Sequence, residues 1–132
     1  LKRLIGYLTS TVTGCNYCRA HTIRAAERYG SNTDQLNEIW NFRESKNFDD
    51  KEKAAFEFAI AASSIPNKVD DKISNELRKY WDDGEIVEIL GVISLFGFLN
   101  RWNDSMRTPI EDGALESGSI HIKNWNPDKH IY

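Results

Sequence analysis

Apolar residues recur at intervals of three and four along most of this chain, which predicts a series of amphipathic helices. The first runs from Leu1 to Val12 and the second from about Cys15 to Tyr29, with a break at Thr13-Gly14 between them. A third helix is expected to begin at a cap formed by Ser31 or Thr33. Its predicted inward-facing residues are Leu36, Ile39, Trp40 and Phe42.

Three more helices are predicted from the same spacing. Residues 47–50 form a loop and cap for a helix that ends before Pro66, because the residue preceding a proline avoids the helical region. Another helix spans Val69 to Trp81. The stretch from Ile86 to Leu99 is the most apolar part of the chain, yet it is shorter than the roughly 18 to 20 residues that span a bilayer. It therefore predicts a central buried helix, and because nearly all of its faces are apolar we expect it to include an oligomer interface.

The periodic pattern fades after Met106, where prolines and glycines interrupt a polar segment. We therefore expect a helical domain over residues 1–106 and an extended C-terminal arm over residues 107–132 that wraps over a neighbouring subunit. The pattern already reads as the middle of a helix at Leu1, so an N-terminal part is expected to precede it. Core packing is the expected role of three tryptophans, Trp40, Trp81 and Trp102.

Composition narrows the class of protein. The 132 residues are 40% hydrophobic and 28% charged, which is typical of one compact domain, and only three prolines and eight glycines favour an all-α fold. The net charge of −3 lacks the positive field that nucleic acid or an anionic membrane would need as a partner.

The clearest candidate chemistry lies in the Cys15-Asn16-Tyr17-Cys18 segment and His21, at the start of the second helix. The positive end of a helix lowers a cysteine pKa, and Cys15 lies nearest to it. His21 follows Cys18 by one turn, where its ring is placed to take a thiol proton. The helix dipole thus favours Cys15 as the activated thiol, and the spacing to His21 favours Cys18. Tyr17 either shapes a substrate pocket or packs.

Other readings of the pair remain open. It could be inert, or it could bind zinc, but a structural zinc site needs a fourth ligand, and sequence alone cannot bring His121 or His130 near. The loop between the cysteines is too short to be a stabilising staple. The segment up to Cys15 also loosely imitates a lipoprotein signal, although polar residues interrupt its apolar run. We expect a redox-active pair without a metal or a cofactor.

These residues also carry a family resemblance. The stretch from Gly14 to His21, followed by Ala25, Ala26 and Gly30, resembles the core of the carboxymuconolactone decarboxylase superfamily, in its alkylhydroperoxidase D (AhpD)-like, peroxidase-related branch. The likeness covers roughly residues 1–106. Further matching segments, in order, are residues 48–52, 69–71, 83–89, 98–104 and an ending at 125–130.

The resemblance implies an AhpD-like helical bundle that forms homo-oligomers and acts as a cytoplasmic thiol-dependent peroxidase. Peroxide would be the substrate, and a dithiol or a thioredoxin-like protein the reductant. Cys18 would attack the peroxide, Cys15 would resolve the sulfenic acid, and His21 would assist. Two positions depart from the best-known members, which have a histidine where this chain has Thr22 and a glutamate where it has Arg3. The alternative is a non-catalytic helical oligomer whose cysteine pair senses redox state or is vestigial.

Overall fold

The computed structural model describes residues 1–131, and over that range it is all-helical, as predicted. The α-helices are α1 (Lys2–Thr13), α2 (Asn16–Arg28), α3 (Thr33–Glu38), α4 (Asp50–Ser63), α5 (Asp71–Arg78), α6 (Asp83–Met106) and α7 (Asp112–His121). Two short 3₁₀ helices, η1 (Ile39–Asn41) and η2 (Asp128–His130), complete the set. None of the described helices is long and apolar enough to cross a membrane.

Side-chain caps explain where several helices begin. Asn32, Asp49 and Asp82 each accept a hydrogen bond from a backbone N–H three residues on, in a reciprocal capping box at the start of α3, α4 and α6. The expected cap at Ser31 or Thr33 is therefore wrong, because the amide of Asn32 between them makes the bond. The Asp70 side chain caps α5 by accepting a hydrogen bond from the Ile73 N–H. Helix α5 therefore begins later than the predicted Val69.

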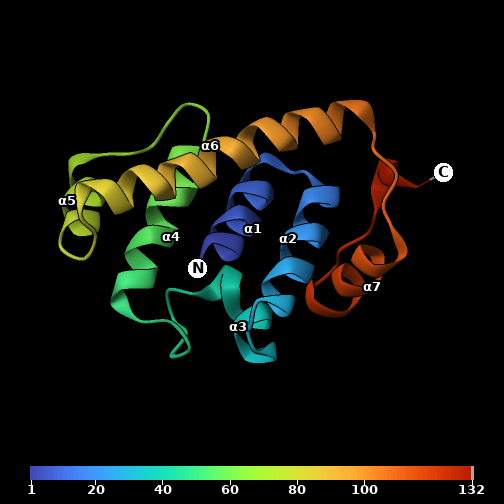
Figure 1. Cartoon of the computed structure of the whole chain (residues 1–132), viewed down its shortest axis with the longest axis horizontal. Coiled ribbons are helices and arrows are strands. Elements are labelled where there is room, and N and C mark those ends of the chain that lie inside the picture. Colours follow the sequence, from blue (N-terminus) through green and yellow to red (C-terminus); the bar gives the residue numbers. More distant parts are fainter. Residues whose placement is uncertain (132) are drawn as a thin grey trace.

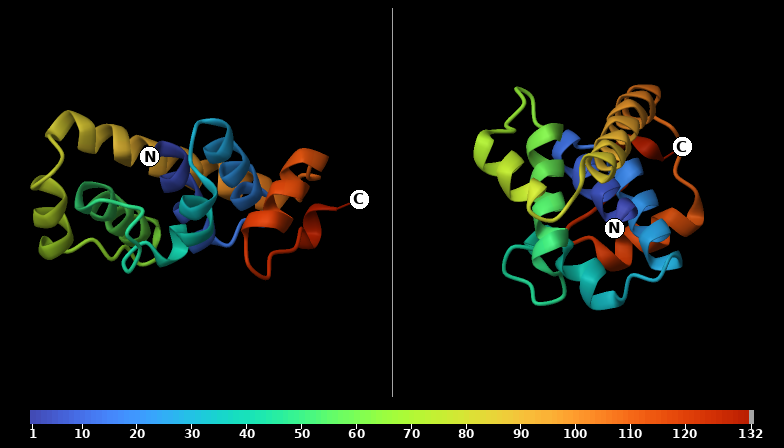
Figure 2. Two further views of the ribbon diagram at one scale, coloured as in Figure 1. Left: turned by 90° about the horizontal axis from the view of Figure 1, so that it is seen from below. Right: turned by 60° about the vertical axis from the view of Figure 1, so that its left-hand side comes forward.

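Helix α1 lies at the centre of the bundle, in contact with α2, α4 and α6 (Figures 1 and 2). The core forms where these helices meet. Its fully buried side chains include Ile5, Leu8, Ile23, Phe42 and Phe56. The ring of Phe56 packs edge-on against that of Phe42, which fixes α4 against the segment after η1. The interior of the bundle thus holds the end of α1 and the start of α2 rigidly.

Helix α6 corrects the prediction of a central buried helix over Ile86–Leu99. It runs along one side of the bundle, from α5 to the segment that leads into α7 (Figure 1). Its neighbours cover only the inner face, where Ile89, Ile93 and Asn100 are buried. The large apolar side chains that stay exposed are Val87, Leu90, Leu95, Phe98, Trp102 and Met106. Two of the predicted core tryptophans are also exposed, Trp102 by 59% and Trp40 by 47%, because both lie on outward faces of their helices.

The C-terminal arm is not extended over its whole length. Residues 112–121 form α7, which packs against α2 of the same chain. Small residues make this contact, since Gly118 brings the backbone of α7 close to Ala20 and the ring of Trp125. The indole Nε1 of Trp125 donates to the Asn16 carbonyl at 3.1 Å. The arm therefore folds back onto the start of α2, and residue 132 of the predicted arm lies outside the described residues.

Candidate active site

The cysteine pair lies at the N-terminus of α2, as predicted. Helix α1 ends at Gly14, whose φ of 82° is a left-handed conformation that favours glycine. Cys15 then takes an extended conformation as the N-cap of α2, and its sulfur accepts a hydrogen bond from the Cys18 backbone N–H at 3.2 Å. The turn thus places both sulfurs at the positive end of the helix.

Cys15 and Cys18 form a disulfide across the first turn of α2, with their Cα atoms 5.3 Å apart. Cys15 is fully buried, and Cys18 retains 4% of its exposure. The Cys18 sulfur lies 3.8 Å from the carbonyl oxygen of Leu99 on α6. The pair therefore sits under α6, with a dithiol and a disulfide as its two accessible redox states.

His21 is held by the segment before α7. Its Nε2 lies 2.6 Å from a carboxylate oxygen of Glu111, and the Tyr17 hydroxyl donates to the other oxygen at 3.2 Å. The rings of Tyr17 and His21 pack with centroids 4.4 Å apart. Tyr17 and His21 of α2 thus form one cluster with Glu111, a residue of the arm that no pattern in the sequence places there.

The cluster shifts the pKa values of two of its members. Burial and the neighbouring Glu111 carboxylate raise the pKa of Tyr17. Burial alone would raise the pKa of Glu111, but hydrogen bonds from its own backbone N–H, from His21 and from Tyr17 outweigh burial and lower it. Glu111 is therefore held as a carboxylate, which keeps the imidazole of His21 paired to it.

The two positions that depart from the family pattern have structural roles. The hydroxyl of Thr22 is buried and hydrogen-bonds to the backbone carbonyls of Cys18 and Arg19. The guanidinium of Arg3 lies over the ring of Tyr29, at 5.2 Å from its centroid. Neither side chain replaces the carboxylate or imidazole of the family's proton relay.

A second acid and a second imidazole come to Cys15 from distant parts of the chain. Asp104 near the end of α6 and His130 of η2 place a carboxylate oxygen and a ring nitrogen beside the Cys15 sulfur, with all three atoms within 4.8 Å of one another. The sequence alone could not show that His130 lies near the cysteines. The one hint of a role for this part of the chain was the likeness of residues 125–130 to the tails of some family members. The structure therefore adds Asp104 and His130 to the candidate site.

These three residues do not form a metal centre in this state. The Cys15 sulfur is bonded to Cys18 and offers no thiolate. Among the described residues the set also has one member fewer than the four ligands of a structural zinc site. His121, the other histidine of the arm, lies 3.8 Å from Glu27 instead.

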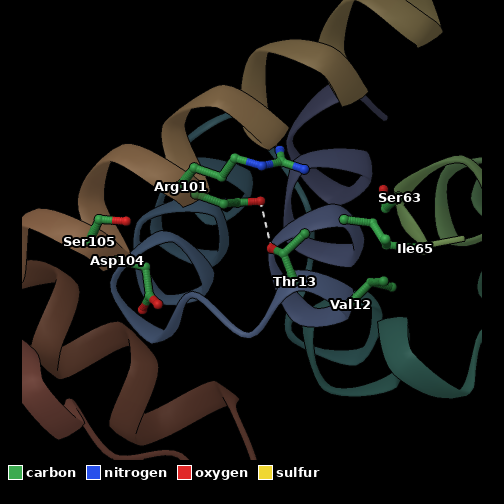
Figure 3. Close-up of a pocket in the computed structure, with 8 residues that line it drawn as sticks. Val12, Thr13, Ser63, Ile65, Arg101, Asp104 and Ser105 are labelled. Carbon is green, nitrogen blue, oxygen red and sulfur yellow. Dashed lines mark hydrogen bonds between the residues drawn. The ribbon is translucent and has the colours of Figure 1, made fainter.

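A pocket of about 390 Å³ opens beside the cysteine turn, between the end of α1, the end of α4 and α6 (Figure 3). Asn100 forms its buried wall, accepting from the Thr13 hydroxyl and donating to the Ser10 hydroxyl, each at 2.8 Å. Arg101 extends along the pocket, and Asp104 lines its other end (Figure 3). Because Asp104 also lies beside Cys15, the pocket reaches the edge of the candidate site.

Three solved structures, of two proteins, have the same fold. The debrominase Bmp8 matches with a TM-score of 0.84 and 33% identity, over 88% of this chain and 62% of Bmp8. A cysteine-to-alanine variant of Bmp8 in complex with 2,3,4-tribromopyrrole matches similarly, with a TM-score of 0.85. A protein of unknown function from Agrobacterium tumefaciens, a candidate antioxidant defence protein AhpD, shares the fold with a TM-score of 0.78 and 24% identity. The helical bundle is therefore AhpD-like.

Residues 1–61, which include the cysteine pair, match the sequence model of the carboxymuconolactone decarboxylase family. Residues 1–61 therefore belong to the carboxymuconolactone decarboxylase superfamily. The chain is 35% identical to the uncharacterized protein YnjA of Escherichia coli K12, over 74% of this chain and 53% of YnjA. It is 25% identical to the uncharacterized protein YdfG of Bacillus subtilis, over 77% of this chain and 68% of YdfG. The chain thus spans about half of YnjA and about three fifths of Bmp8.

Proposed function

We propose that this protein is a thiol-dependent peroxidase of the cytoplasm. The observation that carries the proposal is the Cys15–Cys18 disulfide at the N-terminus of α2, with acid and imidazole side chains beside it. The Cys18 thiolate attacks the distal peroxide oxygen, the O–O bond breaks, and an alcohol or water leaves. Cys15 then attacks the Cys18 sulfenic acid, which releases water and forms the disulfide. A dithiol or a thioredoxin-like protein reduces the disulfide.

The assignment of Cys18 as the attacking thiol rests on exposure as well as on the family resemblance. Cys18 keeps a small exposed area, whereas Cys15 has none and meets peroxide less readily. The same difference suits Cys15 as the resolving thiol, because its partner sulfur is only one helical turn away. We assign His21 and Tyr17, whose side chains Glu111 holds from the segment before α7, to the binding of peroxide or reductant.

Peroxide consumption with excess dithiothreitol tests the proposal. The parent protein should consume hydrogen peroxide or cumene hydroperoxide over many turnovers, and Cys18→Ser should abolish consumption. Cys15→Ser is the matched control, since after removal of dithiothreitol it should still be oxidised once and accumulate a sulfenic acid at Cys18 that dimedone traps. Turnover by Cys18→Ser at the parent rate would refute the assignment. A single oxidation without further turnover would support the non-catalytic redox sensor instead.

The similarity to Bmp8 supports a second candidate, reductive removal of bromine from an aromatic ring. The electron balance is the same, because a dithiol that becomes a disulfide supplies the two electrons that replace a carbon–bromine bond with a carbon–hydrogen bond and release bromide. Incubation of the reduced protein with 2,3,4-tribromopyrrole, with bromide as the readout, separates the two reactions. Bromide release that exceeds peroxide consumption would favour the second candidate.

A further inference from the structure

The hydrogen bonding of His130 fixes which of its ring nitrogens carries the proton. The side chain is fully buried, and its Nδ1 lies 2.9 Å from the carbonyl oxygen of Thr108. A carbonyl oxygen only accepts, so Nδ1 must be the donor. In the neutral ring Nε2 is then unprotonated, and this buried nitrogen has no hydrogen-bond partner among residues 1–131. A buried imidazole nitrogen with a free lone pair is thus present beside the disulfide.

The surroundings of Nε2 suit a group that gains and loses a proton. It lies 3.4 Å from Oδ1 of Asp104, close enough for the carboxylate to stabilise an imidazolium, although the geometry is not that of a hydrogen bond. The other oxygen of Asp104 pairs with Lys129 at 2.8 Å. From α2, the Cys15 sulfur lies in the same cluster, and the ring of Tyr17 is 5.6 Å from that of His130. Within residues 1–131, these four side chains are the titratable groups of the cluster around His130.

Cys15 is the group in this cluster that needs a proton acceptor. It is fully buried, and loss of water disfavours a thiolate, which is the form that attacks sulfur. The Cys18 N–H that its sulfur accepts stabilises the thiolate once it exists, but removes no proton. His21 is paired with Glu111, which leaves the imidazole of His130 as the base beside the Cys15 sulfur.

We propose that Nε2 of His130 accepts the proton of Cys15 when Cys15 resolves the oxidised Cys18, and that Asp104 stabilises the resulting imidazolium. The inference rests on the thiol–disulfide cycle of the proposed function. The Cys15 proton moves to Nε2 as its sulfur attacks the Cys18 sulfur. The sulfur–oxygen bond of the sulfenic acid breaks, and the departing hydroxide takes the proton from His130 and leaves as water. When a reductant thiol attacks Cys18 and opens the disulfide, the proton that this thiol loses passes through Nε2 of His130 to the released Cys15 thiolate.

The test follows the resolving step with 2,2′-dithiodipyridine, so that it does not depend on peroxide. In the reduced protein Cys18 attacks the reagent and releases one pyridinethione. Cys15 then displaces the second from the mixed disulfide, and the rate of this second release reports the ionisation of Cys15. His130→Asn keeps an amide N–H near the position of Nδ1 for the Thr108 carbonyl while removing the basic nitrogen.

We expect the second release to be about a hundredfold slower in His130→Asn at pH 7, the lower edge of the roughly 10²- to 10⁴-fold range of general base catalysis. The difference should narrow as the pH rises beyond the ordinary cysteine pKa of about 8.5, because a growing fraction of Cys15 then ionises without a base. Asp104→Asn should show a smaller slowing with the same pH dependence. The matched control is His121→Asn, which changes a second histidine of the arm and should leave the second release unchanged.

Equal second-release rates in the parent and His130→Asn would overturn the inference. A second release that is slowed by the same factor at every pH in His130→Asn would also overturn it, because a pH-independent loss indicates a structural role. If His130→Asn does not fold, Asp104→Asn decides by the same two criteria. A parent protein that consumes no peroxide, but whose second release depends on His130 in the expected way, would refute the peroxidase proposal and leave the role of His130 supported.

Discussion

At the scale of single residues, Glu111 links the arm to the site through its carboxylate. Its folded-state pKa is lowered, so its contribution to stability is present above the unfolded pKa of about 4.3 and is lost as the pH falls through the folded value. Glu111→Gln should therefore lower the free energy of unfolding at pH 7. The loss should stay below about 1 kcal/mol because the side chain is largely exposed.

Urea unfolding of the parent and Glu111→Gln at pH 7 and at pH 3 checks this expectation. The difference between the two proteins should shrink at pH 3, where the Glu111 carboxylate is being protonated. Glu116→Gln is a suitable control, because this exposed glutamate of α7 should give no difference at either pH. A difference that is equal at both pH values would show that the Glu111 carboxylate does not stabilise the arm by its charge.

The residues of the site divide by how far apart they lie in the sequence. Cys15, Tyr17, Cys18 and His21 could be predicted together, because one helix start holds all four within seven positions. The contact between Cys15 and His130 joins the two ends of the chain, and it depends on how α7 and η2 fold back. No local period or motif encodes that return, so the base beside Cys15 became visible only in the structure.

At the scale of elements, the packing of α7 on α2 depends on Gly118. A Cβ at this position would lie 3.0 Å from the Cβ of Ala20 and from the ring of Trp125, which is tighter than ordinary contact. Gly118→Val adds two more methyl groups there, so we expect a cost of about 1 to 3 kcal/mol and loosening of the arm. Limited proteolysis should then cut the arm of the variant faster than that of the parent.

Gly91→Ala is the matched control for this prediction. It also changes a helical glycine, but its Cβ would meet no atom within 4 Å, so the variant should be as stable as the parent or more stable by about 0.5 to 1 kcal/mol. Parent-like resistance of the arm in Gly118→Val would show that the close approach does not hold α7.

The same close approach explains why α7 could not be predicted from the sequence. Ala114, Ser117 and Gly118 bury its inner face, and such small residues give little hydrophobic period.

At the scale of the whole molecule, the order and type of the helices from α1 to α6 could be predicted, because apolar spacing and breaks in it are local. The burial of α6 could not. Apolar residues around its circumference show that its faces avoid water, but not whether this chain or another covers them. The structure separates the two faces. Ile89 and Ile93 pack on the bundle, and Phe98 and Trp102 stay exposed.

The exposed face of α6 carries the last prediction, that the protein is a homo-oligomer joined along this helix. The rings of Phe98 and Trp102 pack side by side with centroids 6.1 Å apart, and Val87, Leu95 and Met106 extend the strip along the helix. Apolar surface exposed to water costs about 25 cal/mol per Å² of free energy. Burying such a strip against a second copy removes this cost, which is comparable to the net stability of a domain. The arm packs on α2 of its own chain, so α6 is the face left for the partner.

Sedimentation at low micromolar concentration checks the assembly. The parent should sediment as a dimer or larger, and Phe98→Glu with Trp102→Glu should sediment near the monomer mass of 15.2 kDa. The double variant should keep its helical circular dichroism, because both side chains already lie outside the core. Tyr29→Glu changes another exposed aromatic residue away from α6 and should leave the oligomer intact. A parent protein that is only a stable monomer would refute the prediction, because the apolar strip would then be tolerated in water.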